Sequence, residues 1–353
     1  MKKGLVMGLV LTMMMGLGVG CGNNTQTSTE ASQDTTQTTS ESSVSSETTN
    51  QGSVGSETNS EVKKIGIVQY VEHPSLDTIR ESITTALAEA GYVEGQNISI
   101  IYQNAQADQS NLNSIASKFV GDEVDLIIAI ATPAAQAMAA ATSDIPIVFS
   151  AVTDPVGAKL VDSLESPSGN VTGTSDAIPV DQMFELCKEL TPDVKTFGFL
   201  YTASEVNSQS VITEAKMLAA DYGFEFVEST ITNSSELQQA AEILATKVDA
   251  IYTPIDNGIA SAMPVLAEVA KTAKIPVYVG ADSMVADGGY ATVGINYEDL
   301  GTKTAEIVAE ILGGKAIKEV PVATLDHFYK VINETTANAI GATSNAEGAT
   351  IVK

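Results

Sequence analysis

From residue 63 onward, short apolar runs alternate with amphipathic segments. The runs KKIGIVQY, ISIIYQ, VDLIIAI and IPIVFSAV are rich in β-branched residues and predict strands. Between them the spacing of apolar residues predicts helices over 74–90, 108–119 and 133–141. Such alternation is typical of a parallel sheet covered by helices on both faces.

The same pattern then restarts. Helices are predicted over 179–190, 206–222, 234–246 and 258–272, and the runs KTFGFLY, FEFVEST, VDAIYTP and IPVYVGAD between them predict strands. Because the second series matches the first run by run, we expect an α/β protein with two similar lobes. Each lobe is a parallel sheet flanked by helices, and the lobes are hinged around a cleft.

The expected division of the chain follows from these two series. We expect five parts: a signal peptide over 1–20, a Ser/Thr-rich tether over 21–61, a first lobe over 63–175 plus 291–332, a second lobe over 176–290 and a C-terminal tail over 333–353. A strong helix over 297–312 is expected to return to the first lobe, since the second series is already complete. The chain then crosses between the lobes more than once, which makes a hinge.

The N-terminus has the composition of a secretory signal. Lys2 and Lys3 precede an uncharged run that ends at Gly20, and Cys21 follows at once. The stretch LGVGC resembles a bacterial lipobox, whose cysteine is acylated, although Gly18 replaces the usual large aliphatic residue. Residues 22–61 hold six acidic residues and no Lys or Arg, so we expect a disordered tether. The alternative is a secreted protein with an unmodified Cys21.

Charge and missing motifs exclude several functions. The net charge of −26 makes nucleic acid an improbable partner, because phosphate binding needs clustered cations. No Walker loop, HExxH, CxxC or GxSxG motif occurs, so we expect no catalysis, cofactor or metal. Cys187 is the only other cysteine and is expected to be a buried apolar residue. His73 and His327 are expected to be surface or turn histidines.

One strand-to-helix corner occurs twice, as IATPAAQ in the first series and YTPIDN in the second. In open α/β sheets, ligands bind outside the carboxyl ends of the strands. In the first corner Thr132 is placed to cap a helix and Pro133 suits its first position, which leaves the amides of Ala134 and Ala135 for an anion such as a carboxylate.

The second corner carries Asp256 and Asn257, which suit an ammonium group. In both corners the alternative is an ordinary helix cap. Two further acids, Asp154 and Asp282, follow matching strands, and each is equally explained as a turn residue.

Several stretches of the chain resemble one family. The runs HPSLD, EAGYVEGQNISI, IATPAAQ, VTDPVGAKLV, YTPIDN and LGTKTAEIVAEILGGK look like the substrate-binding lipoproteins of ABC importers that include tryptophan and tyrosine transport proteins. The resemblance implies a periplasmic-binding-protein fold of type I, with a separate permease and ATPase as partners. It implies a carboxylate site at Thr132, Pro133 and Ala134 and an amino site at Asp256 and Asn257. The cleft would be completed by Gln69, Tyr70, Ser150, Asp154, Asn207 and Asp282.

We therefore expect an extracytoplasmic lipoprotein, anchored through Cys21 to the outer face of a bacterial membrane. It would capture an amino acid, preferably aromatic such as tryptophan or tyrosine, and deliver it to the permease by closing its lobes. The alternatives are a branched-chain amino acid or another small carboxylate as ligand, a surface sensor or adhesion lipoprotein, and a surface enzyme with Asp154 or Asp256 as base.

Overall fold

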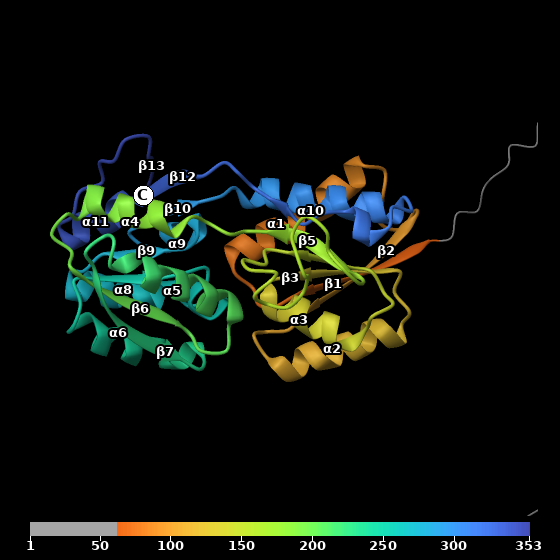
Figure 1. Cartoon of the computed structure of the whole chain (residues 1–353), viewed down its shortest axis with the longest axis horizontal. Coiled ribbons are helices and arrows are strands. Elements are labelled where there is room, and N and C mark those ends of the chain that lie inside the picture. The colour runs from red at the N-terminus through yellow and green to blue at the C-terminus, as the bar shows by residue number, and fades with distance from the viewer. Residues whose placement is uncertain (1–61) are drawn as a thin grey trace, which may run out of the picture. The chain divides into compact units, whose positions relative to one another are not determined.

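Two helix-covered sheets, one in each of two lobes, make up the part of the chain that the computed structural model describes, residues 62–353 (Figure 1). The signal peptide, Cys21 and the tether, all predicted before residue 62, lie outside the described residues. Within the described residues, no helix has the length and apolar character needed to cross a bilayer.

The first lobe is built on a parallel sheet with the strand order β11-β5-β4-β3-β1-β2. Its central strands are buried on both faces, as expected for a sheet between two helical layers. The strands are β1 (Lys63–Gln69), β2 (Ile98–Asn104), β3 (Leu126–Ile130), β4 (Ile147–Ser150), β5 (Val171–Ser175) and β11 (Ala323–Thr324).

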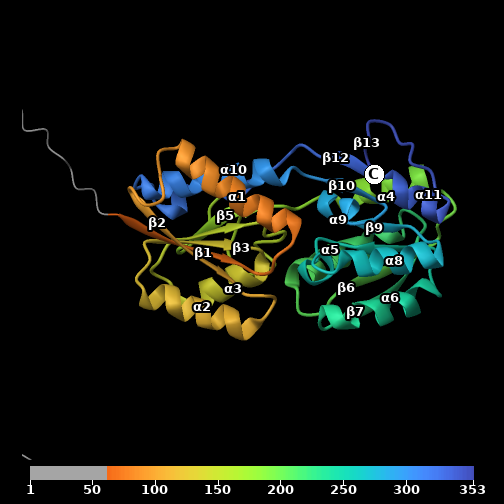
Figure 2. The ribbon, with the colours of Figure 1, turned by 180° about the vertical axis from the view of Figure 1, so that it is seen from behind.

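Two pairs of helices cover this sheet: α1 (Pro74–Glu89) with α10 (Tyr297–Leu312), and α2 (Gln109–Gly121) with α3 (Thr132–Ala141). The two pairs lie on opposite faces (Figures 1 and 2). The first pair is in close contact at Gly301, where an added Cβ would lie 2.7 Å from the Cβ of Ser82 and 2.8 Å from the carbonyl oxygen of Ile79. A glycine is therefore needed at this crossing.

The second lobe has a sheet with the strand order β13-β12-β10-β9-β8-β6-β7. β12 runs antiparallel to β10, and β13 pairs parallel with β12, so these two strands run opposite to the other five. The strands are β6 (Thr196–Thr202), β7 (Glu225–Ile231), β8 (Ala250–Thr253), β9 (Val277–Val279), β10 (Ala291–Gly294), β12 (Tyr329–Asn333) and β13 (Thr350–Val352).

Helices again pack on both faces of this sheet. One face carries α4 and α5 over an aromatic core that includes Phe197, Tyr252 and Tyr278, and the other carries α6 and α8. The helices of the lobe are α4 (Val180–Leu190), α5 (Val206–Ala219), α6 (Leu237–Ala245), α7 (Asn257–Ala260), α8 (Met263–Ala273), α9 (Asp282–Ala286) and α11 (Glu334–Ile340). Two 3-10 turns complete the fold, Ser234–Glu236 before α6 and Ile317–Glu319 after α10.

The structure corrects the predicted boundaries between the lobes. Residues 291–332 were assigned to the first lobe and 333–353 to a tail, but β10, β12, α11 and β13 all belong to the second lobe. Of this part of the chain only the segment from α10 to β11 packs with the first lobe. The reason is that β10 continues the sheet beside β9, and β12 and β13 then extend it.

The helix predicted over 258–272 is interrupted. It forms two helices, α7 and α8, with Ala262 between them in a non-helical conformation. Pro264 lies in the first turn of α8, where its missing N–H leaves no donor unsatisfied. The short α7 therefore stands alone at the carboxyl end of β8, where the second copy of the repeated corner lies.

Candidate functional site

The corner between β3 and α3 has a strained backbone. Ala131 precedes α3 with φ 80° and ψ 153°, a region that residues other than glycine rarely adopt, and Ala151 after β4 has φ 56°. Such strain persists only where the surroundings enforce it, and it is concentrated at functional sites. The Ala131 amide donates to the Ser150 carbonyl at 2.9 Å, which ties the two corners together.

Two predictions about this corner need correction. The residue at the helix cap is Ala131, not Thr132, and no side chain caps the helix. The amide of Ala135 is also taken, since it donates to the Ala131 carbonyl at 3.1 Å. Ala134 lies one residue earlier, where the amides of a helix lack an intrahelical acceptor. The hydroxyl of Thr132 is buried and has no hydrogen-bond partner.

Gln69 and Tyr70 form the neighbouring corner, at the end of β1. Gln69 is fully buried and its amide donates to Asp77 at 2.8 Å and to the Val71 carbonyl at 2.9 Å, so it shapes the turn. Tyr70 is 9% exposed. Burial raises the pKa of Tyr70 to about 12, with a further contribution from Glu205 and Asp256 of the second lobe. Its hydroxyl also lies 3.4 Å from the Ala107 carbonyl of the first lobe, to which it donates.

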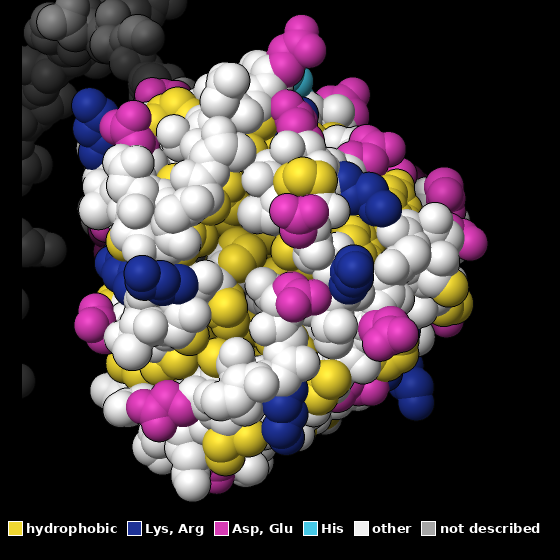
Figure 3. Space-filling view, turned by 90° about the vertical axis from the view of Figure 1, so that its left-hand side faces the viewer, with side chains coloured by type: hydrophobic (Ala, Val, Ile, Leu, Met, Phe, Trp, Pro, Cys, Tyr) yellow, Lys and Arg dark blue, Asp and Glu magenta, His cyan; other side chains and the backbone are white. Residues whose placement is uncertain are grey.

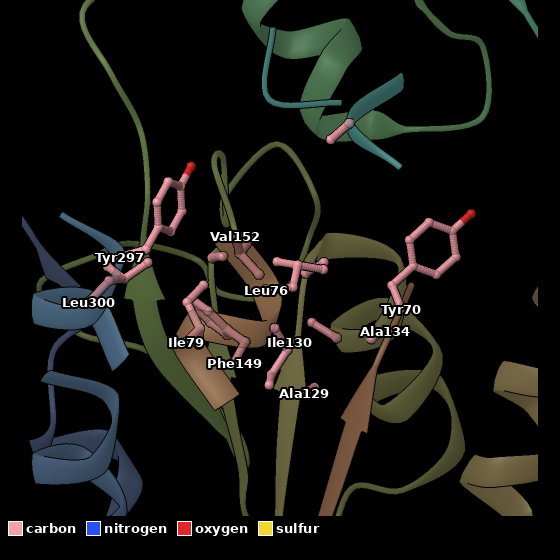
Figure 4. Close-up of a cluster of buried hydrophobic side chains, with 14 of the residues drawn as sticks. Tyr70, Leu76, Ile79, Ala129, Ile130, Ala134, Phe149, Val152, Tyr297 and Leu300 are labelled. Atoms are coloured by element: carbon pink, nitrogen blue, oxygen red, sulfur yellow. The ribbon is translucent and has the colours of Figure 1, made fainter. Parts of the chain in front are cut away.

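Between these corners lies an apolar surface. Figure 4 shows Tyr70 and Tyr297 extending toward the second lobe, with Leu76 and Val152 between them and Ala134 near Tyr70. All five side chains are buried. An apolar floor with a few polar groups at its margins is the usual composition of a small-molecule site.

In the second lobe, Asp256 is a structural carboxylate. It is fully buried and caps α7 by accepting from the Ile259 amide at 2.9 Å. It also accepts from the Thr202 amide at 2.6 Å, the Thr202 hydroxyl at 2.7 Å and the Ser208 hydroxyl at 2.8 Å. These donors occupy both oxygens. The prediction that Asp256 meets a ligand amino group is not supported by these contacts.

Glu205 is a second buried carboxylate that sequence reasoning missed. It accepts from the amides of Asn257 and Gly258 at 3.1 and 2.9 Å, and from the side chain of Asn257 at 2.5 Å. Burial and the nearby Asp256 raise the pKa of Glu205 to about 8, and these N–H donors act in the opposite direction. Its position before α5 gave no signal, since the segment between β6 and α5 reads as an ordinary turn.

Asn207 is the predicted residue of this wall with spare hydrogen-bonding capacity. It is 3% exposed, and its amide nitrogen donates to the Ile255 carbonyl at 2.8 Å and to Glu205 at 3.1 Å. Its side-chain oxygen is buried without a partner. Unpaired buried polar atoms are costly, so Asn207 and Thr132 each present a group suited to a ligand.

Two hydrogen bonds join the lobes directly, both from the start of α1. The ring Nε2 of His73 lies 3.3 Å from Oδ1 of Asn257, and the hydroxyl of Ser75 lies 2.6 Å from that of Ser283. His73 was predicted to be a surface or turn histidine, but it is 6% exposed, and burial lowers its pKa to about 4. Its burial depends on a contact with a distant segment, which no local pattern reveals.

Ser150 is not part of this surface. Its hydroxyl is fully buried and lies 2.8 Å from Thr304 of α10 and 3.3 Å from Thr174 of β5. The three hydroxyls form an interior cluster beneath α10. The structure therefore gives Ser150 a packing role rather than a place on the floor of the site.

The matched acids Asp154 and Asp282 lie in two separate hollows between the lobes. Asp154 accepts from the Gly157 amide at 2.8 Å as a turn residue and borders a hollow of about 390 Å³ against α5. Asp282 accepts from the Tyr329 hydroxyl at 2.8 Å and borders a hollow of about 400 Å³ beside the start of α1. The structure does not bring these two acids together.

A further hollow lies away from these corners. It has a volume of about 610 Å³, lies between α6 and α8, and is lined mostly by apolar groups with Glu242 and Glu268 at its rim. Hydrophobic side chains are also visible among charged ones of both signs on the end of the second lobe (Figure 3). Among the described residues, no group of His, Cys, Asp and Glu is arranged to hold a metal ion.

Comparisons with known proteins agree with this architecture. The family model for ABC transporter substrate binding proteins matches residues 64–348. A tyrosine-binding protein of Clostridioides difficile is 49% identical over 278 residues, which cover 79% of this chain and 81% of that protein.

Two solved structures are also similar. A domain from Streptococcus pneumoniae in complex with L-Trp has a TM-score of 0.80 at 39% identity, and the match covers 83% of this chain and 100% of that one. A ligand-free, open substrate-binding protein with adhesive properties from Clostridium difficile has a TM-score of 0.64 at 46% identity, with 83% and 99% covered.

Proposed function

Because this chain belongs to the family of ABC transporter substrate-binding proteins, we propose that it captures an amino acid, preferably aromatic, between its two lobes. Its similarity to a tyrosine-binding protein and to a domain that holds L-Trp supports this ligand class. The proposal extends to delivery: the bound amino acid passes to a permease powered by a separate ATPase. The family and the fold are those of solute-binding proteins, not of enzymes.

The observation that carries the proposal is a pair of unpartnered buried groups on opposite walls. Thr132 of the first lobe offers a hydroxyl beside the free end of α3, and Asn207 of the second lobe offers an amide oxygen. In our proposal the ligand carboxylate binds at Thr132 and the Ala134 amide, where the helix dipole favours an anion. The apolar floor with Tyr70 and Tyr297 receives the side chain.

We propose that the two lobes are closed in this structure. The structural similarity is higher to the L-Trp complex than to the ligand-free, open structure, although sequence identity runs in the opposite order. The direct bonds His73–Asn257 and Ser75–Ser283 are then formed on closure. If the closed form is about 1% populated without ligand, reaching about 99% needs roughly 5.5 kcal/mol of differential binding.

Substrate-binding proteins of ABC transporters are extracytoplasmic, and we propose that this one is held at the outer face of the membrane. The sequence features that support this location are the predicted signal over 1–20, the lipobox-like stretch before Cys21 and the predicted tether over 21–61. Loss of lipid labelling in Cys21→Ser would test the anchor independently of ligand binding.

A thermal-shift screen of the purified protein tests the ligand class. The twenty amino acids, a set of sugars and a set of nucleosides are compared, because a ligand that binds only the native state raises the melting temperature by mass action. We expect a shift with L-tyrosine or L-tryptophan that Thr132→Val reduces. The exposed Thr85 of α1 provides the matched control, Thr85→Val, which leaves the shift unchanged. A shift restricted to sugars or nucleosides would overturn the proposal.

A further inference from the structure

Three buried carboxylates lie at the meeting of the lobes, and they differ in how many protein donors they receive. Asp256 and Glu205 each accept several hydrogen bonds that engage both oxygens. Asp176 is 1% exposed and accepts one hydrogen bond from another residue, from the Thr153 hydroxyl at 2.8 Å to Oδ1. Of the three, Asp176 receives the fewest donors, since beyond Thr153 only its own backbone N–H hydrogen-bonds to it.

Asp176 lies where the chain leaves the first lobe. It directly follows β5, at the carboxyl end of the sheet, and precedes α4 of the second lobe. Thr153, which holds it, follows the strained corner at Ala151 and is adjacent to Val152 of the apolar floor. The aspartate is therefore tied, through Thr153, to the segment that carries Val152 of the floor.

A second observation points to a ligand at the same place. Tyr297 is 4% exposed, and its ring extends from the floor toward the second lobe (Figure 4). Its hydroxyl forms no well-aligned hydrogen bond, although the nearby Ser75 hydroxyl acts to lower its pKa. Burial raises the pKa of Tyr297 well above its ordinary value, and Asp176 is the charged group that contributes most to that rise. The charge of Asp176 therefore acts on the Tyr297 hydroxyl more strongly than that of Asp282.

The charge of Asp176 is uncompensated. No Lys, Arg or His of residues 62–353 forms an ion pair with it. Burial raises the pKa of Asp176 to about 6, against the effect of the Thr153 hydrogen bond. With this pKa, the Asp176 carboxyl is ionised in most molecules at pH 7. An ionised buried group without a cation is strongly unfavourable. A cation brought by the ligand would remove that penalty.

We propose that Asp176 binds the ammonium group of the ligand, with the Tyr297 hydroxyl beside it. This assignment rests on the proposed function, and it specifies the ligand class: compounds with a protonated amine bind, and analogues without one do not. It also separates the roles of the acids, because Asp256 and Glu205 then build the second wall while Asp176 contacts the ligand.

Isothermal titration calorimetry on the full chain tests this assignment. L-Tyrosine is compared with 3-(4-hydroxyphenyl)propionate, which lacks the amine, and with tyramine, which lacks the carboxylate. In the wild type we expect the analogue without the amine to bind at least about 100-fold more weakly than L-tyrosine, as loss of a buried ion pair implies. Asp176→Asn should weaken L-tyrosine by a similar factor and leave 3-(4-hydroxyphenyl)propionate within about threefold of its wild-type affinity.

The controls separate a ligand contact from a structural role. Asp193→Asn makes the same change of charge at an exposed position of the second lobe and should alter neither affinity. Thr153→Val removes the hydroxyl that holds Asp176; it should weaken L-tyrosine and tyramine but not the analogue without the amine. It serves as a second test should Asp176→Asn fail to fold.

The possible outcomes are distinct. Equal weakening of all three compounds in Asp176→Asn and in Thr153→Val, or unchanged binding of L-tyrosine in both, overturns the assignment and leaves the proposed function intact. A wild-type protein that binds neither L-tyrosine nor L-tryptophan nor tyramine overturns both.

Discussion

Removal of the Asp256 carboxylate should destabilise the second lobe even when no ligand is present. Asp256 is fully buried and accepts from two backbone amides, those of Thr202 and Ile259, and from the hydroxyls of Thr202 and Ser208. In Asp256→Ala the hydroxyls can rotate toward other acceptors, whereas the two amides are fixed. Each buried unsatisfied amide costs about 1–3 kcal/mol.

The net effect is smaller than the sum of these losses. Asp256 raises the pKa of the neighbouring Glu205, so its removal also relieves a repulsion between two buried carboxylates. We therefore expect the free energy of unfolding to fall by about 3 kcal/mol. For a protein of this size that corresponds to a decrease in melting temperature of about 6 °C.

Urea denaturation followed by far-UV circular dichroism measures this change without ligand; the chain has no Trp, so indole fluorescence cannot serve. Asp193→Ala removes an exposed acid of the same lobe and should stay within about 0.5 kcal/mol of the wild type. If Asp256→Ala unfolds like the wild type but no longer binds an amino acid, then Asp256 contacts the ligand and our reading of its hydrogen bonds is wrong.

Three further predictions concern other parts of the molecule. Burial lowers the pKa of His73 to about 4, so the stability that neutral His73 lends the closed lobes is present above its ordinary pKa and is lost as pH falls toward 4. The dissociation constant at pH 5 divided by that at pH 7 should therefore be about tenfold smaller in His73→Gln than in the wild type. An equal ratio in the two proteins would contradict this. Cys187 is buried and its pKa is raised to about 11 by burial, so a thiol reagent should label the native protein at least about 100-fold more slowly than the denatured one. Gly301→Ala should lower the free energy of unfolding by about 1–3 kcal/mol, because the added methyl group pushes α1 and α10 apart. In the control Gly121→Ala the added methyl group meets open space, so the free energy of unfolding should not fall. Equal effects of the two substitutions in urea denaturation would refute the steric argument.

The fold could be predicted from sequence wherever a pattern was local. Strand and helix alternation identified both lobes, and the repeated Thr-Pro corner lies at the carboxyl end of β3 and of β8, as such corners should. The boundaries between the lobes were less accessible. β10 has four buried residues and no alternation, so nothing in the sequence of Ala291–Gly294 distinguishes a strand of one lobe from a strand of the other.

The candidate site was harder to predict because its chemistry depends on distant partners. Asp256 has the same local context whether it caps a helix or meets a ligand, and what decides is Thr202 and Ser208, which lie 54 and 48 residues away. Asp176 lies at the boundary between the two predicted lobes, where the sequence analysis identified no site residue. Its burial and its bond to Thr153 depend on a segment 23 residues away, which the local sequence does not encode.

The most direct test of this account is a crystal structure of the protein grown with L-tyrosine or L-tryptophan. We predict the amino acid between the lobes, with its carboxylate at Thr132 and the Ala134 amide and its ring on the apolar floor between Tyr70 and Tyr297. An amino acid bound outside the interlobe surface, or one whose carboxylate lies away from the start of α3, would contradict the central claim.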